Sequence, residues 1–319
     1  MSRYVICGAT GFMGRNIAER FGNLFPGKVV GIWFKTNPPE IEGVTWRQAD
    51  LRDPVQVDAL IKEGDVLIQA AATTSGAKDI IERPYIHTTD NAVINSLLLR
   101  VCYEKNAGQF IFTSCPVVYP PDLGRALKET DFRGELTPSS PHFGVGWTKV
   151  YIEKMCEFYA KLGRTKHMVF RHSNCYGPYD KYDLDRSHMY GATVTKVMEA
   201  VDGGSITVWG PGTEGRDLIY VDDVVDFIVA ALQQKNPFEL VNLGCGQAYP
   251  VIEVVKTIIE ASGKNLTIKH DLSKPHIPSK IWLDTSKALE LYGWKSKTSL
   301  MEGTKKTLAW YKKYFQGSN

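Results

Sequence analysis

A glycine-rich turn near the amino terminus constrains the fold of this chain more than any other feature. Gly8, Gly11 and Gly14 directly follow the apolar run Tyr4–Cys7, and a helical pattern begins at Phe12. In a strand–turn–helix unit, such glycines let the backbone approach a pyrophosphate, and the amino terminus of the helix presents a positive dipole to it. The turn therefore predicts the first unit of a Rossmann fold, with a dinucleotide-binding site at the start of the helix.

The chain before residue 172 alternates short apolar runs with amphipathic stretches. This pattern is typical of a parallel sheet with helices on both faces, because right-handed crossovers alternate with the strands. The sequence thus predicts an α/β fold with a doubly wound Rossmann sheet. The expected strands are Tyr4–Cys7, Val29–Trp33, Val44–Gln48, Val66–Ala70, Phe110–Thr113 and Met168–Arg171. The expected helices are Phe12–Phe21, Pro54–Ile61, Thr89–Lys105 and Trp147–Leu162.

The pattern changes after Arg171, where a loop rich in Gly, Pro, Tyr and Asp covers Ser173–Ser187. We expect residues 1–171 to form the dinucleotide-binding Rossmann domain and residues 172–319 to form a smaller α/β substrate-binding domain. Segments around 215–243 are expected to return to the first domain. The elements predicted in this half are helices near Ala192–Val201, Asp222–Leu232, Val251–Ala261 and Met301–Tyr314, and a strand at Ile206–Trp209.

Composition excludes several classes of protein. The formal net charge is +3, with 38 basic and 35 acidic residues and no long block of one sign, so neither nucleic acid nor a membrane surface is an expected partner. No apolar run approaches the ~18 residues that a membrane helix needs. The six cysteines show neither metal-ligand spacing nor a paired framework, which predicts free thiols in a reducing cytoplasm and no metal site.

The choice of cofactor depends on the end of the second strand. Sites that select NAD usually place an acidic residue there to bind the ribose, but this strand is followed by Phe34 and Lys35. Lys35, helped by Arg15, favours a 2′-phosphate and hence NADP(H), with NAD(H) as the alternative; both cations are otherwise surface charges. The predicted cofactor-binding residues are Gly8, Thr10, Gly11, Phe12, Met13, Gly14, Arg15, Lys35, Asp50, Leu51, Ala70, Ala71, Ala72 and Lys149.

A set of motifs resembles the extended short-chain dehydrogenase/reductase superfamily of nucleotide-sugar epimerases, dehydratases and reductases. The matches run from residue 4 to about residue 300, nearly the whole chain. The matching segments are GATGFMG at 8–14, ADLRD at 49–53, AAA at 70–72, TSCPVVYP at 113–120, GWTK at 146–149, NCYGPYD at 174–180 and RDLIYVDD at 216–223.

Within the superfamily, the chain most resembles the GDP-L-fucose synthase family. That family carries a Ser-Ser-Cys-x-x-Tyr-Pro segment and a Ser-His before a helix, which match Thr113–Pro120 and Ser187-His188 here. The resemblance implies that Cys115 and His188 are the acid/base pair of a 3,5-epimerase acting on a GDP-4-keto-6-deoxyhexose, with NADPH-dependent reduction at C4. It also implies a homodimer formed by the helices near Thr89–Lys105 and Trp147–Leu162. The residues that would bind the nucleotide sugar are Asn174, Trp209, Arg216 and Lys280.

The chain departs from the superfamily at the position that matters most for hydride transfer. The usual catalytic unit is Tyr-x-x-x-Lys on one helix face, assisted by a Ser or Thr hydroxyl. Lys149 and Thr113 are present, but Val145 stands where the tyrosine is expected, and valine cannot donate a proton.

Three interpretations of Val145 remain open from the sequence. The redox step is impaired; epimerisation proceeds through Cys115 and His188 with the cofactor as a bystander; or another group replaces the tyrosine, with His142, Tyr151 and Cys115 as the nearby candidates. Competing functions are an NDP-sugar 4-epimerase or 4-dehydrogenase with tightly bound NAD, and a non-catalytic sugar-nucleotide-binding protein.

Overall fold

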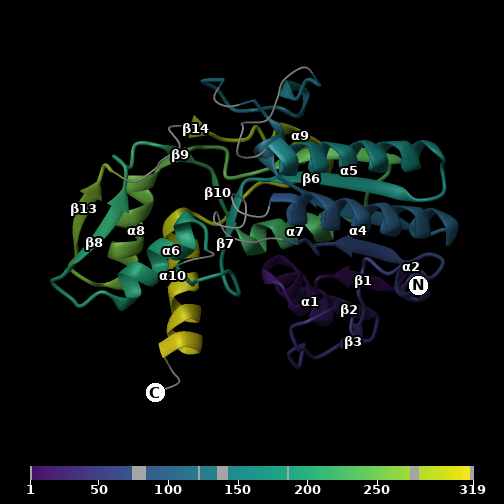
Figure 1. Ribbon diagram of the computed structural model, residues 1–319, viewed down its shortest axis with the longest axis horizontal. Helices are drawn as coiled ribbons and strands as arrows, with labels where there is room; N and C mark the ends of the chain where they lie inside the picture. The colour runs from purple at the N-terminus through teal and green to yellow at the C-terminus, as the bar shows by residue number, and fades with distance from the viewer. Residues whose placement is uncertain are drawn as a thin grey trace.

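A seven-stranded parallel sheet forms the larger body of the protein (Figure 1). The computed structural model describes residues 2–73, 84–120, 123–134, 143–184, 187–273 and 280–316. Every ladder in the sheet is parallel, and the strand order is β11-β6-β5-β4-β1-β2-β3. The doubly wound Rossmann sheet is therefore confirmed. Its strands are β1 Tyr4–Cys7, β2 Val29–Trp33, β3 Val44–Gln48, β4 Val66–Gln69, β5 Gln109–Ser114, β6 Lys166–His172 and β11 Phe238–Leu243.

Helices cover both faces of this sheet. Successive residues of each strand point to opposite faces, so each strand contributes side chains to two cores. Val5 and Cys7 of β1 belong to the core beneath α4 and α5, whereas Ile6 belongs to the core beneath α1 and α7. Apolar runs without polar alternation therefore become strands that are buried on both faces. The helices of this body are α1 Phe12–Leu24, α2 Pro54–Leu60, α4 Pro84–Glu104, α5 Phe143–Lys161, α7 Val221–Ala231 and α9 Ser286–Tyr292.

Three departures from the predicted elements affect the site. Strand β6 extends one residue beyond Arg171, to His172. Helix α5 begins at Phe143, four residues before the predicted Trp147, so Val145 lies within its first turn. Strand β11 adds an edge to the sheet beside β6, and α7 and α9 pack near it. The division of the chain into domains at residue 171 stays a prediction.

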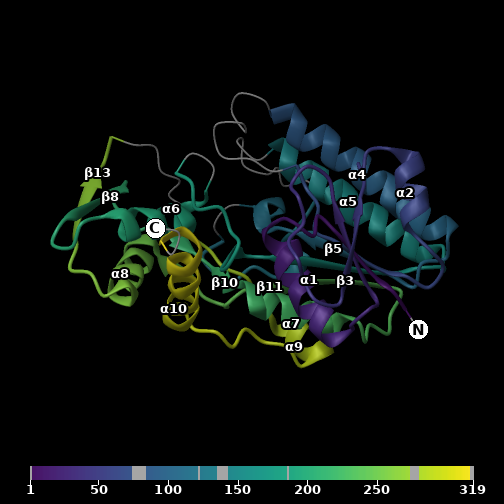
Figure 2. The ribbon, with the colours of Figure 1, turned by 90° about the horizontal axis from the view of Figure 1, so that it is seen from below.

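A second, smaller body surrounds a separate core that contains Tyr176, Tyr190, Val194, Val254 and Leu308. Figure 2 shows it beside the sheet, with α8 and α10 next to each other. Strand β13 was not predicted. Most of its residues are exposed, so its sequence lacks a clear alternation of apolar and polar residues. The elements here are α6 Met189–Glu199, α8 Val251–Ser262, α10 Leu300–Tyr311 with a π-helical turn at Lys312–Gln316, β8 Ser205–Trp209, β13 Thr267–Asp271, β7 Asn174–Tyr176, β10 Leu218–Tyr220, β9 Gly215–Arg216, β12 Tyr249–Pro250 and β14 Lys280–Ile281.

Two short 3-10 helices, Pro116–Val118 and Glu129–Asp131, follow β5 along the chain. Strands β7 and β10 pair with each other, β8 pairs with β13, and β9 lies between β12 and β14. No helix in the described ranges is long and apolar enough to cross a membrane.

Candidate functional site

The turn between β1 and α1 requires glycine at two positions. Gly8 has a φ of +71°, and a Cβ atom there would lie 2.7 Å from the Cα atom of Ala71. A Cβ atom on Gly14 would overlap the carbonyl oxygen of Gly8. These contacts bring the start of α1 against the carboxyl ends of β1 and β4, where a dinucleotide binds in folds of this kind.

The amino terminus of α1 has the donor groups that a pyrophosphate needs. Gly11 is the capping residue, and within the described chain no side chain caps the helix. The amides of the first turn, in Phe12, Met13 and Gly14, have no acceptor inside the helix because no preceding turn exists. Together with the helix dipole, they fit an anionic diphosphate. Thr10 lies in the same turn and is half-buried.

Two cations lie near the end of β2. Lys35 was predicted there, but its neighbour is Arg52 and not the predicted Arg15. Lys35 is exposed, with Nζ 5.5 Å from the centre of the Phe34 ring, and the guanidinium carbon of Arg52 lies 5.5 Å from the same ring. Arg52 also binds Asp50, with Nη2 2.8 Å from Oδ2, and this hydrogen bonding lowers the pKa of Asp50. Sequence analysis missed Arg52, although it stands inside the ADLRD segment.

Arg15, the predicted helper of Lys35, is held elsewhere. Its guanidinium carbon stacks 3.7 Å from the centre of the Tyr179 ring, and its Nε lies 3.4 Å from Glu19. Of the other predicted cofactor residues, Leu51 is buried in the core beneath α4 and α5. Ala70, Ala71 and Ala72 follow β4, and the N–H of Ala71 donates to Gln69 Oε1 at 3.1 Å.

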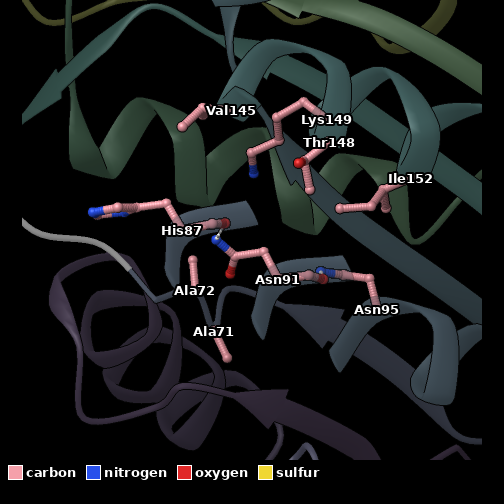
Figure 3. Close-up of a pocket in the computed structure, with 9 residues that line it drawn as sticks. All are labelled: Ala71, Ala72, His87, Asn91, Asn95, Val145, Thr148, Lys149 and Ile152. Carbon is pink, nitrogen blue, oxygen red and sulfur yellow. Dashed lines mark hydrogen bonds between the residues drawn. The ribbon is translucent and has the colours of Figure 1, made fainter. Parts of the chain in front are cut away.

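A small cavity lies where α5 faces α4 and the residues that follow β4 (Figure 3). The side chains of Val145 and Lys149 both point into it from one face of α5. A separation of four residues places two helical side chains on the same face, so Val145 occupies the position that the tyrosine would take. The lining residues are Ala71, Ala72, His87, Asn91, Asn95, Val145, Thr148, Lys149 and Ile152.

Lys149 reaches the carboxyl end of β5. Its Nζ donates a hydrogen bond of 2.8 Å to the carbonyl oxygen of Thr113, and burial lowers the pKa of its amine. The hydroxyl of Thr113 donates to the carbonyl oxygen of Gln69 at 3.0 Å. That proton is therefore used within the sheet, and the assisting role in hydride transfer predicted for the Thr113 hydroxyl requires this bond to break.

Cys115 follows β5 directly and caps the 3-10 helix Pro116–Val118. Burial raises the pKa of its thiol, while the charge of Lys149 and the N–H of Val117 act in the opposite direction. His188 stands just before α6, and desolvation, reinforced by the charge of Lys181, lowers the pKa of its ring. The charges of Lys149 and His188 both act on His172 at the end of β6. Lys149 is thus within electrostatic range of both Cys115 and His172, and His188 is within range of His172.

A buried ion pair supports this edge from below. Arg171 of β6 binds Glu153 of α5, with Nη2 2.6 Å from Oε2, and their side chains are only 3% and 4% exposed. Ser114 of β5 donates to Glu153 Oε1 at 2.6 Å. Because Glu153 lies one turn after Lys149, this network fixes the position of α5 relative to β5 and β6.

The residues predicted to bind the nucleotide sugar lie in the second body and where it joins the first. Arg216 on β9 and Lys280 on β14 occupy neighbouring strands, and burial lowers the pKa of the Arg216 guanidinium. Asn174 begins β7, and its Nδ2 donates to the carbonyl oxygen of Asp217 at 3.1 Å. Trp209 ends β8 with 53% of its surface exposed, and Lys196 Nζ lies 5.7 Å from the centre of its ring.

The model of the NAD-dependent epimerase/dehydratase family matches residues 4–244. The chain belongs to this family. The resemblance to extended short-chain dehydrogenase/reductases is thereby confirmed, and the chain is an enzyme of that type by family.

The chain is similar to several proteins whose names contain different sugar nucleotides. It is 26% identical to GDP-L-colitose synthase of Yersinia pseudotuberculosis, over 97% of both chains. It is 28% identical to GDP-L-fucose synthase of Sinorhizobium fredii, over 80% of this chain and 82% of that protein. The crystal structure of UDP-glucose 4-epimerase from Thermotoga maritima with UDP-glucose has a TM-score of 0.82 and 25% identity, covering 98% of this chain and 99% of that one.

Among the proposed substitutes for the tyrosine of this family, Tyr151 is excluded by its position. It lies two residues after Lys149 and therefore points to a different side of α5. Its hydroxyl lies 3.0 Å from Ser96 Oγ, and 42% of the residue is exposed. His142 falls outside the described residues. Cys115 remains beside Lys149.

Sequence analysis missed the contribution of α4 to the cavity. The side chain of Asn91 donates to the carbonyl oxygen of Thr73 at 3.1 Å and accepts from the N–H of the same residue at 2.9 Å. Asn95 accepts from Gln69 Nε2 at 3.0 Å. Asn91 and Asn95 are four residues apart, so helical spacing was the available signal for their shared face.

Proposed function

We propose that this chain inverts the carbons beside the ketone of a GDP-4-keto-6-deoxyhexose and reduces C4 with NADPH. The observation that carries the proposal is the position of Lys149 beside Cys115 at the carboxyl end of β5. The named relatives favour a GDP-linked sugar, since two of them are GDP-L-colitose and GDP-L-fucose synthases. A nucleotide sugar as the substrate class is supported by both the GDP- and the UDP-linked relatives.

The chemistry of the assembled residues suits epimerisation. A proton on carbon next to a carbonyl can be removed when the enolate is stabilised, and a thiol and an imidazole exchange protons near neutral pH. Cys115 and His188 would move these protons, while the Lys149 ammonium would stabilise the developing negative charge. A nicotinamide dinucleotide whose pyrophosphate is held at the β1–α1 turn would supply or accept a hydride in this site.

NADP(H) is the proposed cofactor, because Lys35 and Arg52 both lie beside Phe34 at the end of β2. NAD(H) is the alternative, since Asp50 and Asp90 partly neutralise Arg52. NAD(H) would accompany the second candidate function, an NDP-sugar 4-epimerase or 4-dehydrogenase, which the likeness to UDP-glucose 4-epimerase favours.

A redox-impaired or non-catalytic binding protein is the third candidate, and one observation favours it. Val145 faces the cavity in the register of the missing tyrosine and brings only hydrocarbon to it (Figure 3). The presence of Lys149, Cys115 and His188 argues against this candidate, because a binding protein has no chemical need for them.

The substrate would lie between the two bodies of the protein. Arg216 suits the diphosphate because a guanidinium forms forked hydrogen bonds with phosphate oxygens. Lys280 lies on the neighbouring strand and adds a second positive charge. The exposed ring of Trp209 offers a stacking surface for the base, and Asn174 lies near the junction of the two bodies.

The proposal includes a homodimer in the cytoplasm. Helices α4 and α5 pack against each other, and Tyr85, Val93, Phe143, Tyr151 and Phe158 expose apolar surface on them. Such surface on adjacent helices suits a symmetric interface with the same helices of a second copy. Sedimentation of the purified chain tests this part of the proposal, and a monomer at all concentrations would contradict it.

Proton exchange tests the enzymatic proposal directly. The chain is incubated with GDP-4-keto-6-deoxymannose in deuterated water, with and without NADPH, while deuterium uptake at C3 and C5 and NADPH loss are followed. Uptake that disappears in Cys115→Ser and His188→Asn, but persists in the controls Cys245→Ser and His270→Asn, is the expected result. Uptake without NADPH loss would restrict the function to epimerisation. The absence of both deuterium uptake and NADPH loss would contradict the GDP-4-keto-6-deoxyhexose assignment.

A further inference from the structure

His87 of α4 lines the same cavity as Val145 and Lys149 (Figure 3). Only 5% of its surface is exposed. Its ring extends to the same side of Lys149 as Val145, whereas Asn95 lies on the other side. His87 was not among the predicted substitutes for the tyrosine. An imidazole at this wall gives the cavity a group that both donates and accepts protons.

The packing of α4 on α5 sets His87 level with Val145. The first helix leads into β5 and the second into β6, which are adjacent parallel strands, so both helices run opposite to the sheet and start at its carboxyl end. His87 stands in the first turn of α4, and Val145 stands in the first turn of α5. One turn further along, Asn91 and Lys149 follow on the cavity faces of the same helices. His87 therefore lies at the level of the missing tyrosine.

The hydrogen bonding of His87 determines which ring nitrogen exchanges a proton. Nδ1 lies 3.2 Å from the carbonyl oxygen of Thr73, and a carbonyl oxygen only accepts hydrogen bonds. Nδ1 therefore carries a hydrogen whether the ring is neutral or charged. Nε2 carries a hydrogen in the imidazolium and a lone pair in the neutral ring, so proton transfer takes place at Nε2.

Asn91 anchors the segment after β4 independently of the imidazole. Its Nδ2 donates to the carbonyl oxygen of Thr73 at 3.1 Å, and its Oδ1 accepts from the N–H of Thr73 at 2.9 Å. The same Nδ2 donates to the backbone carbonyl oxygen of His87 at 2.6 Å, a bond that any residue at position 87 can accept. Thr73 therefore keeps two hydrogen bonds to α4 when the imidazole is removed.

We propose that His87 is a catalytic acid and base of this site, and that its Nε2 has the role that a tyrosine at position 145 would have. This rests on the proposed function, because it assumes a 4-keto sugar nucleotide and a reduced nicotinamide dinucleotide. In the reduction, the imidazolium gives its Nε2 proton to the ketone oxygen. That oxygen gains the electron pair of the C=O bond as C4 gains a hydride from the dinucleotide. The neutral ring then takes a proton from water, and oxidation of the alcohol reverses every transfer.

The variant His87→Asn removes the proton group and keeps a donor. The asparagine amide can donate to the carbonyl oxygen of Thr73, but it has nothing in the place of Nε2. His270→Asn is the matched control, because His270 Nδ1 lies 2.9 Å from the carbonyl oxygen of Gly210 in the second body. NADPH oxidation with GDP-4-keto-6-deoxymannose should fall about 100-fold in His87→Asn and match the wild type in the control.

Deuterium uptake at C3 and C5 separates the loss of a proton group from a damaged site. Cys115 and His188 are proposed to move these protons, and His87 takes no part in that step. His87→Asn should therefore keep the deuterium uptake of the wild type while it loses NADPH oxidation. A parallel fall in uptake and oxidation would mean a structural role and overturn the proposal, as would NADPH oxidation equal to that of the wild type.

Val145→Tyr provides a second test of the proton role. In this background a phenol offers another proton group, so adding His87→Asn should cost less than about tenfold in NADPH oxidation, against about 100-fold in the natural chain. A structural contribution of His87 would cost the same factor in both backgrounds. Equal costs would therefore overturn the proposal.

The wild-type chain distinguishes this proposal from the function on which it rests. Deuterium uptake without NADPH oxidation in the wild type would overturn the role of His87 and leave the epimerase intact. The absence of both signals would remove the proposed function and the role of His87 with it. NADPH oxidation that depends on His87, together with deuterium uptake that does not, is the result expected.

Discussion

The β1–α1 turn and the β5–β6 edge lie at the same end of one sheet, but different parts of the chain specify them. At the turn, backbone geometry defines the site: a side chain on Gly8 or Gly14 has no room against Ala71 or the Gly8 carbonyl. At the edge, side chains define it, with Lys149 on α5, Cys115 directly after β5 and His188 directly before α6.

This difference explains why one region follows its family and the other departs from it. A backbone site changes only if the turn itself changes, and such a change would lower the stability of the fold. A side-chain site can lose one member, as Val145 shows, while its neighbours and the strands that carry them stay in place. The following predictions test this contrast between the two regions.

The largest expected effect concerns the buried ion pair beneath the edge. Glu153→Ala leaves the Arg171 guanidinium buried without its partner, so the free energy of unfolding should fall by about 3–5 kcal/mol. Denaturant titration measures this change. Replacing the half-buried Glu157, which pairs with the exposed Lys161, by alanine should cost less than about 1 kcal/mol. Glu153→Leu combined with Arg171→Met should recover most of the loss, and equal costs at Glu153 and Glu157 would refute the argument.

The backbone site is tested by Gly14→Ala. The new Cβ atom overlaps the Gly8 carbonyl and pushes α1 away from β1, so unfolding should become easier by about 1–3 kcal/mol. Dinucleotide binding, followed by calorimetry, should be lost as well. Gly134→Ala is the control, because nothing lies within 4 Å of a Cβ atom there. A Gly14→Ala protein that binds dinucleotide normally would show that the backbone is not the determinant.

The side-chain site is tested by Val145→Tyr in the otherwise natural chain. A phenol beside Lys149 adds a proton group for hydride transfer, so NADPH oxidation with the sugar nucleotide should rise at least about tenfold, or about 1.4 kcal/mol in the barrier. Val145→Phe has the same ring without the hydroxyl and should give no gain. A gain in both variants would mean that packing, and not the proton, limits the reaction.

The smallest effect is expected at the end of β2. Lys35→Ala removes one exposed charge near the proposed 2′-phosphate, so NADP⁺ affinity should fall about fivefold, while NAD⁺ affinity stays unchanged. Arg15→Ala should change NADP⁺ affinity less, because Arg15 stacks on Tyr179. Fluorescence titration with both dinucleotides measures this, and equal losses for the two would rule out a 2′-phosphate site at Lys35.

The strands show how far local pattern reaches. β1, β2 and β3 have the predicted bounds. β1 and β2 are short apolar runs, and β1 ends at the turn residue Gly8. Strand β13 was missed, since a strand with mostly exposed residues carries no apolar alternation. Helical spacing in the sequence was enough to exclude Tyr151 and to group Asn91 with Asn95, although neither inference was drawn from it.

The sequence by itself determined the parallel sheet, the glycine turn and the register of Val145 with Lys149. Each of these follows from residues close together in the chain, where spacing alone determines which side chains share a face. Only the tertiary structure decided that Arg52 flanks Phe34, that the Thr113 hydroxyl binds Gln69 and that Ser114 pairs with Arg171. These contacts join different segments, and strand order and register, which depend on packing of the whole sheet, bring those segments together.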